Sequence, residues 1–155
     1  MIETPRRYFL VTGKGTGYKA LNAFDAALRD AGVGNVNLVK MSSIIPPHCR
    51  EISPISLPYG ALVPAAYASL SVEDDSKDVI GAGVAIAFSE DENLPALIME
   101  YEDYADRKII EDTVREMAIS GLKSRGWKLK KVKSIAVDMR VERVGSVFAA
   151  VILWY

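Results

Sequence analysis

The last eight residues of the chain, FAAVILWY at positions 148–155, decide how the fold is assembled. They contain no charged side chain, and an end so apolar would not stay frayed in water. We therefore expect the strand predicted over 146–155 to lie in the centre of a sheet or in a contact between subunits.

The elements predicted upstream surround this strand with further strands and two helices. The predicted strands cover 8–12, 36–41, 61–70, 79–88, 96–102 and 133–141, and the predicted helices cover 20–31 and 107–125. Gly32 stands where a helix commonly ends, and the acidic segment 73–78 is typical of a turn. The strands follow one another rather than alternating with helices, which indicates an α+β fold with helices packed on a mainly antiparallel sheet.

Length and charge restrict the possible partners. The 155 residues are enough for one domain, and 19 basic residues balance 20 acidic ones, which argues against a nucleic-acid partner. The apolar run 79–88 is too short to cross a membrane, the N-terminus has no targeting pattern, and Cys49 is the single cysteine. We expect a cytoplasmic protein with no membrane partner; the 50% of hydrophobic residues fit either a large core or an oligomer interface.

Two segments resemble known ligand-binding motifs but lack the spacing or the residues that those motifs need. The glycine-rich segment 13–17 follows a strand, yet its spacing is neither that of a P-loop nor that of a dinucleotide-binding fingerprint. We interpret it as a flexible turn between strand and helix. His48 and Cys49 are adjacent and have no second histidine or cysteine to complete a zinc site, so no metal is expected.

Two carboxylates stand close to apolar faces. On the helix 20–31, Asp25 lies beside the face that Leu21, Phe24 and Leu28 would form. On the strand 96–102, alternation places Glu100 on the face of Ala96 and Ile98. A half-buried carboxylate is costly unless it is paired, so each is a candidate either for an ion pair or for catalysis.

Ser42 and Ser43 follow a strand directly and precede Ile44-Ile45-Pro46-Pro47. The two prolines forbid a regular element and restrict the backbone where a hydroxyl could attack the carbonyl before it. Asn37, in the strand upstream, could donate a hydrogen bond from its amide.

An ordered set of segments resembles the pyruvoyl-dependent arginine decarboxylases. The segments are LNAFD 21–25, GNVNL 34–38, SSI 42–44 with PP 46–47, GALVP 60–64, IMEYE 98–102, TVREM 113–117 and LWY 153–155. They span nearly the whole chain in order, which makes the resemblance specific.

The resemblance implies that the chain is a precursor that cuts itself. The hydroxyl of Ser43 would attack the carbonyl of Ser42 to give an ester, and elimination and hydrolysis would leave a pyruvoyl group at residue 43. The products would be a β chain of residues 1–42 and an α chain of residues 43–155. Asn37 matches the asparagine that assists self-cleavage, consistent with an oxyanion donor.

The resemblance also implies a lyase that converts L-arginine to agmatine and CO2, a reaction of polyamine biosynthesis. The pyruvoyl group would form a Schiff base with the substrate and accept electrons, without pyridoxal phosphate or metal. Glu100 matches the family's proton donor, whose pKa burial should raise, and Asp25 matches the carboxylate that binds the guanidinium.

The family's architecture is a layered αββα sandwich, assembled as a homotrimer with active sites between subunits. Alternatives to this function are the same chemistry on another basic amino acid, a paralogue that is never cut and only binds a cationic metabolite, and a purely structural interaction domain.

Overall fold

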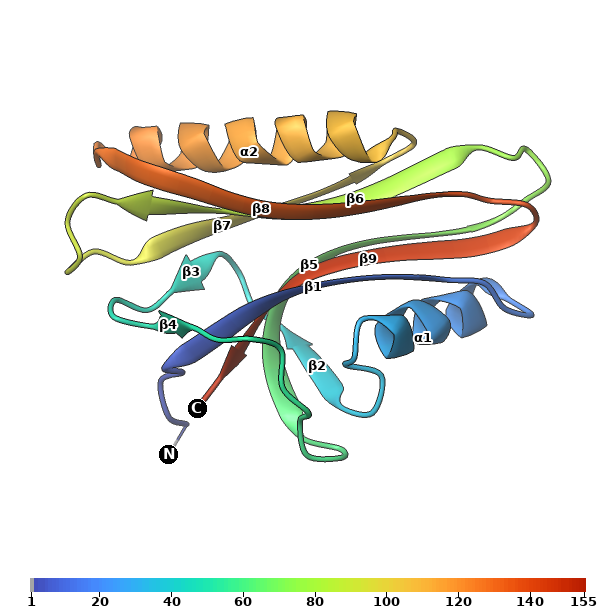
Figure 1. The fold of residues 1–155 in the computed structure, drawn as a ribbon, viewed down its shortest axis with the longest axis horizontal. Coiled ribbons are helices and arrows are strands. Elements are labelled where there is room, and N and C mark those ends of the chain that lie inside the picture. The colour runs from blue at the N-terminus through green and yellow to red at the C-terminus, as the bar shows by residue number, and fades with distance from the viewer. Residues whose placement is uncertain (1) are drawn as a thin grey trace.

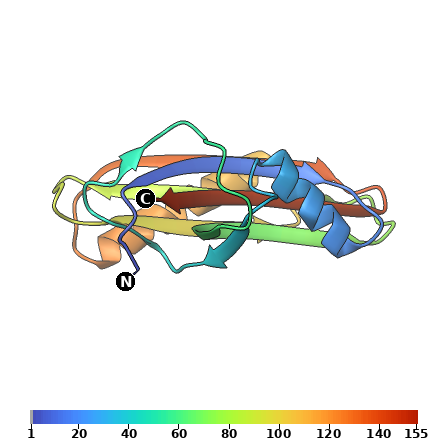
Figure 2. The ribbon, with the colours of Figure 1, turned by 90° about the horizontal axis from the view of Figure 1, so that it is seen from below.

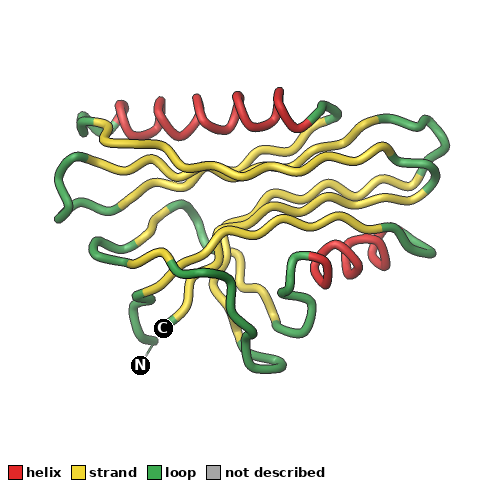
Figure 3. Tube along the Cα trace, in the orientation of Figure 1, coloured by secondary structure: helices red, strands yellow, loops and turns green. Residues whose placement is uncertain are grey.

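A computed structural model of the chain describes residues 2–155 as four layers. The elements, in chain order, are β1 (Arg7–Gly15), α1 (Ala20–Asp30), β2 (Asn37–Lys40), β3 (Ile44–Ile45), β4 (Arg50–Glu51), β5 (Leu62–Glu73), β6 (Val79–Ser89), β7 (Ala96–Asp103), α2 (Arg107–Ser124), β8 (Leu129–Arg140) and β9 (Val144–Trp154). Sheet A has the order β2-β5-β9-β1-β4, and sheet B has the order β3-β7-β6-β8. The two sheets stack face to face, α1 covers the outer face of sheet A and α2 that of sheet B (Figures 1 and 3). The αββα sandwich is thus confirmed.

Both sheets are mainly antiparallel, as expected. The exceptions are two short edge pairs, β2 with β5 and β1 with β4, which run parallel. The predicted strands and helices are all present, although β1 is longer than predicted at both ends and β5 and β8 are longer at one end. The proline segment holds only the two-residue strands β3 and β4.

The central position of β9 explains its composition. It pairs with β5 on one side and with β1 on the other, and every residue from Val144 to Leu153 is buried. Val147, Ala149 and Val151 face the core between the two sheets, while Phe148 and Ile152 belong to the cluster on the outer face of sheet A, where Phe148 contacts Phe24 of α1. Since both faces of the strand are covered, no position can carry a charge without a partner.

Helix α1 approaches sheet A through small residues. Its buried positions are Ala23 and Ala27, and a Cβ atom added to Gly13 would lie 2.0 Å from the carbonyl oxygen of Ala27. Gly13 and Gly15 belong to β1, so the interpretation of 13–17 as a flexible turn was wrong for the first three residues. The glycines let helix and strand backbones come close.

The predicted apolar face of α1 was also partly wrong. Leu21 is 76% exposed, because the helix turns its alanines toward the sheet and leaves the N-terminal leucine outside. Phe24 and Leu28 are half-buried against the core of sheet A, as expected.

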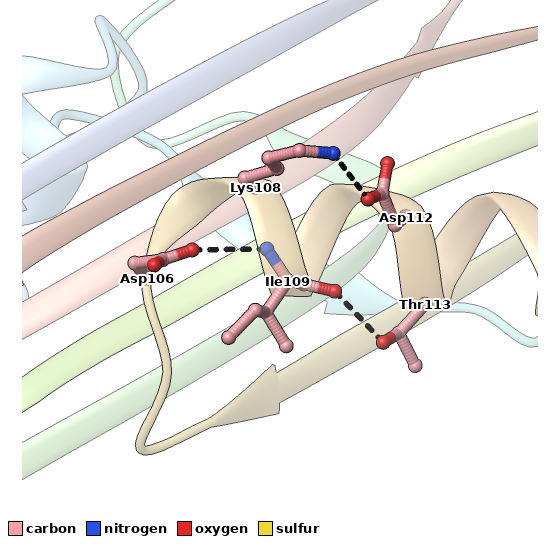
Figure 4. A network of polar contacts seen from close by, with 5 residues as sticks. All are labelled: Asp106, Lys108, Ile109, Asp112 and Thr113. Atoms are coloured by element: carbon pink, nitrogen blue, oxygen red, sulfur yellow. Dashed lines mark hydrogen bonds and ion pairs between the residues drawn. The ribbon is translucent and has the colours of Figure 1, made fainter.

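Helix α2 covers sheet B with Ile110, Val114, Ala118 and Leu122, one residue per turn. Its first turn is capped by Asp106, whose Oδ1 accepts a hydrogen bond from the Ile109 N–H at 3.0 Å (Figure 4). Neither helix of residues 2–155 is long and apolar enough to span a membrane.

Replacing Gly13 by alanine should weaken the docking of α1. The new methyl group would overlap the Ala27 carbonyl, and such overpacking costs about 1–3 kcal/mol. Thermal unfolding of Gly13→Ala and of Thr16→Ala, an exposed residue nearby, measures the difference. A variant at Gly13 that melts no lower than the Thr16 control would show that the close approach is not needed.

Candidate active site at the crossover between the sheets

The chain passes from sheet A to sheet B within three residues, Met41 to Ser43. The Met41 N–H donates to the Ala65 carbonyl on β5 at 3.0 Å, and the Ile98 N–H on β7 donates to the Ser43 carbonyl at 2.7 Å. The peptide bond between Ser42 and Ser43 is therefore held on both sides, one side by each sheet. Ser42 is exposed and Ser43 is half-buried.

Glu100 lies two residues beyond the contact that holds Ser43. Strand β3 runs antiparallel to β7 with Ile44 opposite Leu97, and the Ser43–Ile98 hydrogen bond continues this register. The regular pairing of β7 with β6 keeps Glu100 on the same face as Ile98, which is buried between the sheets. The structure thus brings together three of the residues singled out from the sequence, Ser42, Ser43 and Glu100.

The carboxyl group of Glu100 is in a partly desolvated position, with its side chain 25% exposed. Burial raises the pKa of Glu100 above its ordinary value, the Lys40 ammonium 3.8 Å away lowers it, and Glu102 raises it. The net direction is upward, so the protonated form is favoured more than in water. The direction expected from the sequence is therefore confirmed.

Asn37 forms hydrogen bonds with residues far from the Ser42–Ser43 bond. Its Nδ2 donates to the Gly60 carbonyl at 3.0 Å and its backbone N–H to the Ala61 carbonyl at 2.8 Å, which fixes the start of β2 against the loop before β5. Strand β2 alone separates Asn37 from Lys40 by roughly 10 Å, since a strand rises about 3.3 Å per residue. Within a single chain, the side-chain amide of Asn37 therefore does not reach the Ser42 carbonyl.

Asp25 is separated from this region too. It is 58% exposed and accepts a hydrogen bond from Arg29 Nε at 3.0 Å, so the expectation that it lies beside the buried face was wrong. The face is formed by Ala23 and Ala27, which point away from Asp25. Helix α1 packs on β1, β5 and β9 and lies in front of the strands of sheet A when the molecule is seen from below (Figure 2). Ser43 is instead hydrogen-bonded to Ile98 of sheet B.

Lys40 was missed by the sequence analysis. It is the last residue of β2, and its Nζ lies 4.6 Å from the centre of the Tyr67 ring as well as close to Glu100. A lysine in an alternating strand is ordinary, and nothing local in the sequence indicates a partner sixty residues away on another sheet.

The other polar groups considered from the sequence form no metal site. No group of three His, Cys, Asp or Glu side chains within residues 2–155 is placed to hold a metal ion. Burial raises the pKa of the Cys49 thiol, and a hydrogen bond with the Arg50 backbone only partly offsets this. Cys49 therefore has less thiolate character than a free cysteine.

The family model and the sequence relatives that match this chain share one description. The family model described as pyruvoyl-dependent arginine decarboxylase (PvlArgDC) matches residues 7–155. A pyruvoyl-dependent arginine decarboxylase of Methanocaldococcus jannaschii is 47% identical over 153 residues, 99% of this chain and 92% of the relative. A protein of the same name from Pyrococcus horikoshii is 40% identical over 154 residues, 97% of this chain and 96% of the relative. Among solved structures, a pyruvoyl-dependent histidine decarboxylase aligns with a TM-score of 0.48 and 12% identity, covering 86% of this chain and 61% of the other.

The pKa of Glu100 predicts a pH dependence of stability. Between the ordinary value of 4.5 and the raised pKa, the folded protein holds a proton that the unfolded chain has lost. The free energy of unfolding contributed by this group is therefore largest at low pH and falls as pH rises through that window. Glutamine does not titrate, so the unfolding free energy of Glu100→Gln lacks this decrease with pH. The unfolding free energy of the variant minus that of the wild type should therefore increase with pH.

Urea unfolding at several pH values, on chains of verified mass, measures this difference. A difference that stays constant or decreases from acid to neutral pH would contradict the assigned environment of Glu100.

Proposed function

The chain belongs to the pyruvoyl-dependent arginine decarboxylase family, and we propose that it converts L-arginine to agmatine and CO2 with a pyruvoyl group made from its own Ser43. The observation that carries this proposal is the 2.7 Å hydrogen bond between the Ile98 N–H and the Ser43 carbonyl. It holds the family's serine two residues along β7 from Glu100, whose carboxyl pKa is raised by burial.

Self-cleavage between Ser42 and Ser43 forms this group. The Ser43 Oγ attacks the Ser42 carbonyl carbon, and an ester C–O bond replaces the peptide C–N bond. Elimination then releases Ser42 as a carboxylate, and hydrolysis releases ammonia and leaves the pyruvoyl group on residue 43. What supports this site of cleavage is the short crossover segment, whose two ends are hydrogen-bonded to different sheets.

Residue 43 fits a pyruvoyl group. The position is half-buried, and its carbonyl already accepts the Ile98 N–H in the uncut chain. When present, the group supplies an electron sink for the carbon that loses CO2. The Ile98 N–H is placed to stabilise negative charge on the carbonyl oxygen of residue 43, as an oxyanion donor does.

Glu100 acts as the proton donor to the carbon that has lost CO2. Its carboxyl group projects from the same strand that holds residue 43, and its raised pKa favours the form that carries a proton. A general acid of this kind contributes about 10²–10⁴ in rate.

The substrate's guanidinium binds Asp25 of a neighbouring protomer, in a homotrimer with sites between subunits. Supporting this arrangement, α1 lies on the outer side of sheet A, away from sheet B and its Glu100. Exposed apolar residues near α1 and near the crossover also suit a contact between two copies of the chain. They are Tyr18 and Leu21 near the start of α1, and Val39, Ile44, Tyr59 and Leu62 around β2 and β3. Asn37 would assist cleavage across the same contact, from a neighbouring protomer, because within one chain its amide bonds the Gly60 carbonyl at the far end of β2 from Ser42. Cys49, the single cysteine, is compatible with a cytoplasmic setting.

Ser43→Ala should remain a single chain, because both the attacking hydroxyl and the source of the pyruvoyl carbons are lost. Ser42→Ala is the matched control: it keeps the Ser43 hydroxyl and should still be cut into two fragments. Intact mass spectrometry distinguishes the two results. A Ser43→Ala chain that is cut at this bond would overturn the proposed processing.

Asp25→Asn should raise KM for arginine roughly tenfold to hundredfold while cleavage continues, since a hydrogen bond to a charged group contributes about 1.5–3 kcal/mol. Asp112→Asn is the control, because Asp112 also forms an i,i+4 pair, with Lys108 at 2.7 Å, on the other helix. Steady-state kinetics with arginine, lysine and citrulline give the comparison. Equal KM values for the two variants would remove Asp25 from the substrate site.

A further inference from the structure

Lys40 joins the two sheets beside the cleavage site. Its ammonium lies 3.8 Å from Glu100 Oε1 on β7 and 4.6 Å from the centre of the Tyr67 ring on β5. Lys40 itself ends β2, two residues before Ser42. One cation therefore contacts both sheets at the point where the chain passes from one to the other.

This ion pair differs from the other surface pairs of the protein. Exposed pairs contribute little, because water screens both charges. Lys40 is 53% exposed, but its partner is only 25% exposed, and the Tyr67 ring holds the ammonium from another direction. A pair with one partly desolvated member and a fixed cation constrains where the carboxyl group lies.

The surroundings of Glu100 leave this role to Lys40. Among the described residues, the charged side chains that act on Glu100 most strongly are Lys40, from β2, and Glu102, on its own strand. Glu102 has the same sign of charge as Glu100. On β6, the residue paired with Glu100 is Val84, which is apolar and buried. The Tyr67 ring of β5 contacts the Lys40 ammonium.

We propose that Lys40 is a positioning residue of the decarboxylase: its ammonium holds the Glu100 carboxyl group beside residue 43 and links the two fragments across the cut. The proposal rests on the proposed function, because Glu100 is a proton donor only there. Lys40 would belong to the 1–42 fragment and Glu100 to the 43–155 fragment, so the pair becomes a contact between two chains after cleavage.

The contact also adjusts the strength of the acid. A donor must hold a proton before the step and release it during the step, and both requirements are met best when its pKa is near the working pH. Burial raises the pKa of Glu100 and Lys40 lowers it, so the lysine keeps the group from becoming too weak an acid.

The first test follows the Glu100 carboxyl group without any catalysis. In the uncut Ser43→Ala chain, carbon-13 NMR of labelled glutamate, assigned with Glu100→Gln, gives the titration of Glu100. Lys40→Met should move its midpoint to higher pH, and Lys40→Arg should leave it near that of the parent. Lys133→Met is the matched control, because Lys133 also crosses between the sheets, to Glu51, at the opposite edges β8 and β4.

The second test uses the processed enzyme. Activity should fall on the alkaline side as the donor loses its proton. With Lys40→Met this fall should move upward by about one pH unit, the lower end of the effect of an opposite charge within ~4–6 Å. The plateau of kcat should drop about tenfold with little change in KM, because the carboxyl group is no longer held in place.

The outcomes separate this inference from the proposed function. An identical Glu100 titration in the Lys40→Met and Lys133→Met chains overturns the role of Lys40, whatever the activity. A shifted titration with an unchanged kcat profile means that Glu100 is not the donor, which overturns its role in the proposed function and the effect of Lys40 on the reaction. A shift in both, absent in the Lys133 control, supports the proposal.

Discussion

The hydrogen bond from the Ile98 N–H to the Ser43 carbonyl is the contact on which the candidate site depends. It starts the short pairing of β3 with β7 and so ends the crossover that begins at Met41. Without it, residues 42 and 43 would be a loop between two sheets, free to take many conformations. With it, one serine is fixed by its own backbone relative to Glu100, which the same strand carries, and to Lys40, which ends the strand before.

Much of the fold could be predicted because buried strands are marked in the sequence by runs without charged residues. The uncharged C-terminal run indicated a central strand or a subunit contact, and β9 is a central strand covered on both faces. The packing of α1 could not be predicted, since alanine and glycine give little signal in a hydrophobicity pattern. Gly13 and Ala27 determine how close strand and helix come, while the larger Leu21, which dominates the pattern, is exposed. The misplaced face in turn misplaced Asp25.

The site could be predicted only where its residues follow each other closely or carry an unusual local pattern. Ser42 and Ser43 are marked by the prolines that follow, and Glu100 by the apolar neighbours on its face of β7. Lys40 has its partners on two other strands, so no window of the sequence contains the contact. Asn37 has a suitable side chain, but whether it reaches Ser42 depends on the length of β2 and on the Gly60 carbonyl, neither of which a residue type reveals.

The strand order of sheet A has a consequence for the cleavage proposed between Ser42 and Ser43. Residues before Ser43 contribute β2 at one edge and β1 between β9 and β4, so a short fragment ending at Ser42 would be interleaved with the long one. After the proposed cut, the fragments would be held by the hydrogen bonds of a sheet that formed while they were still one chain. Refolding from separated fragments would be a second-order reaction, in which two chains must meet and thread into alternating places. The uncut chain would thus be the template for its own assembly, and after such a cut the lifetime of the enzyme would be governed by its rate of unfolding.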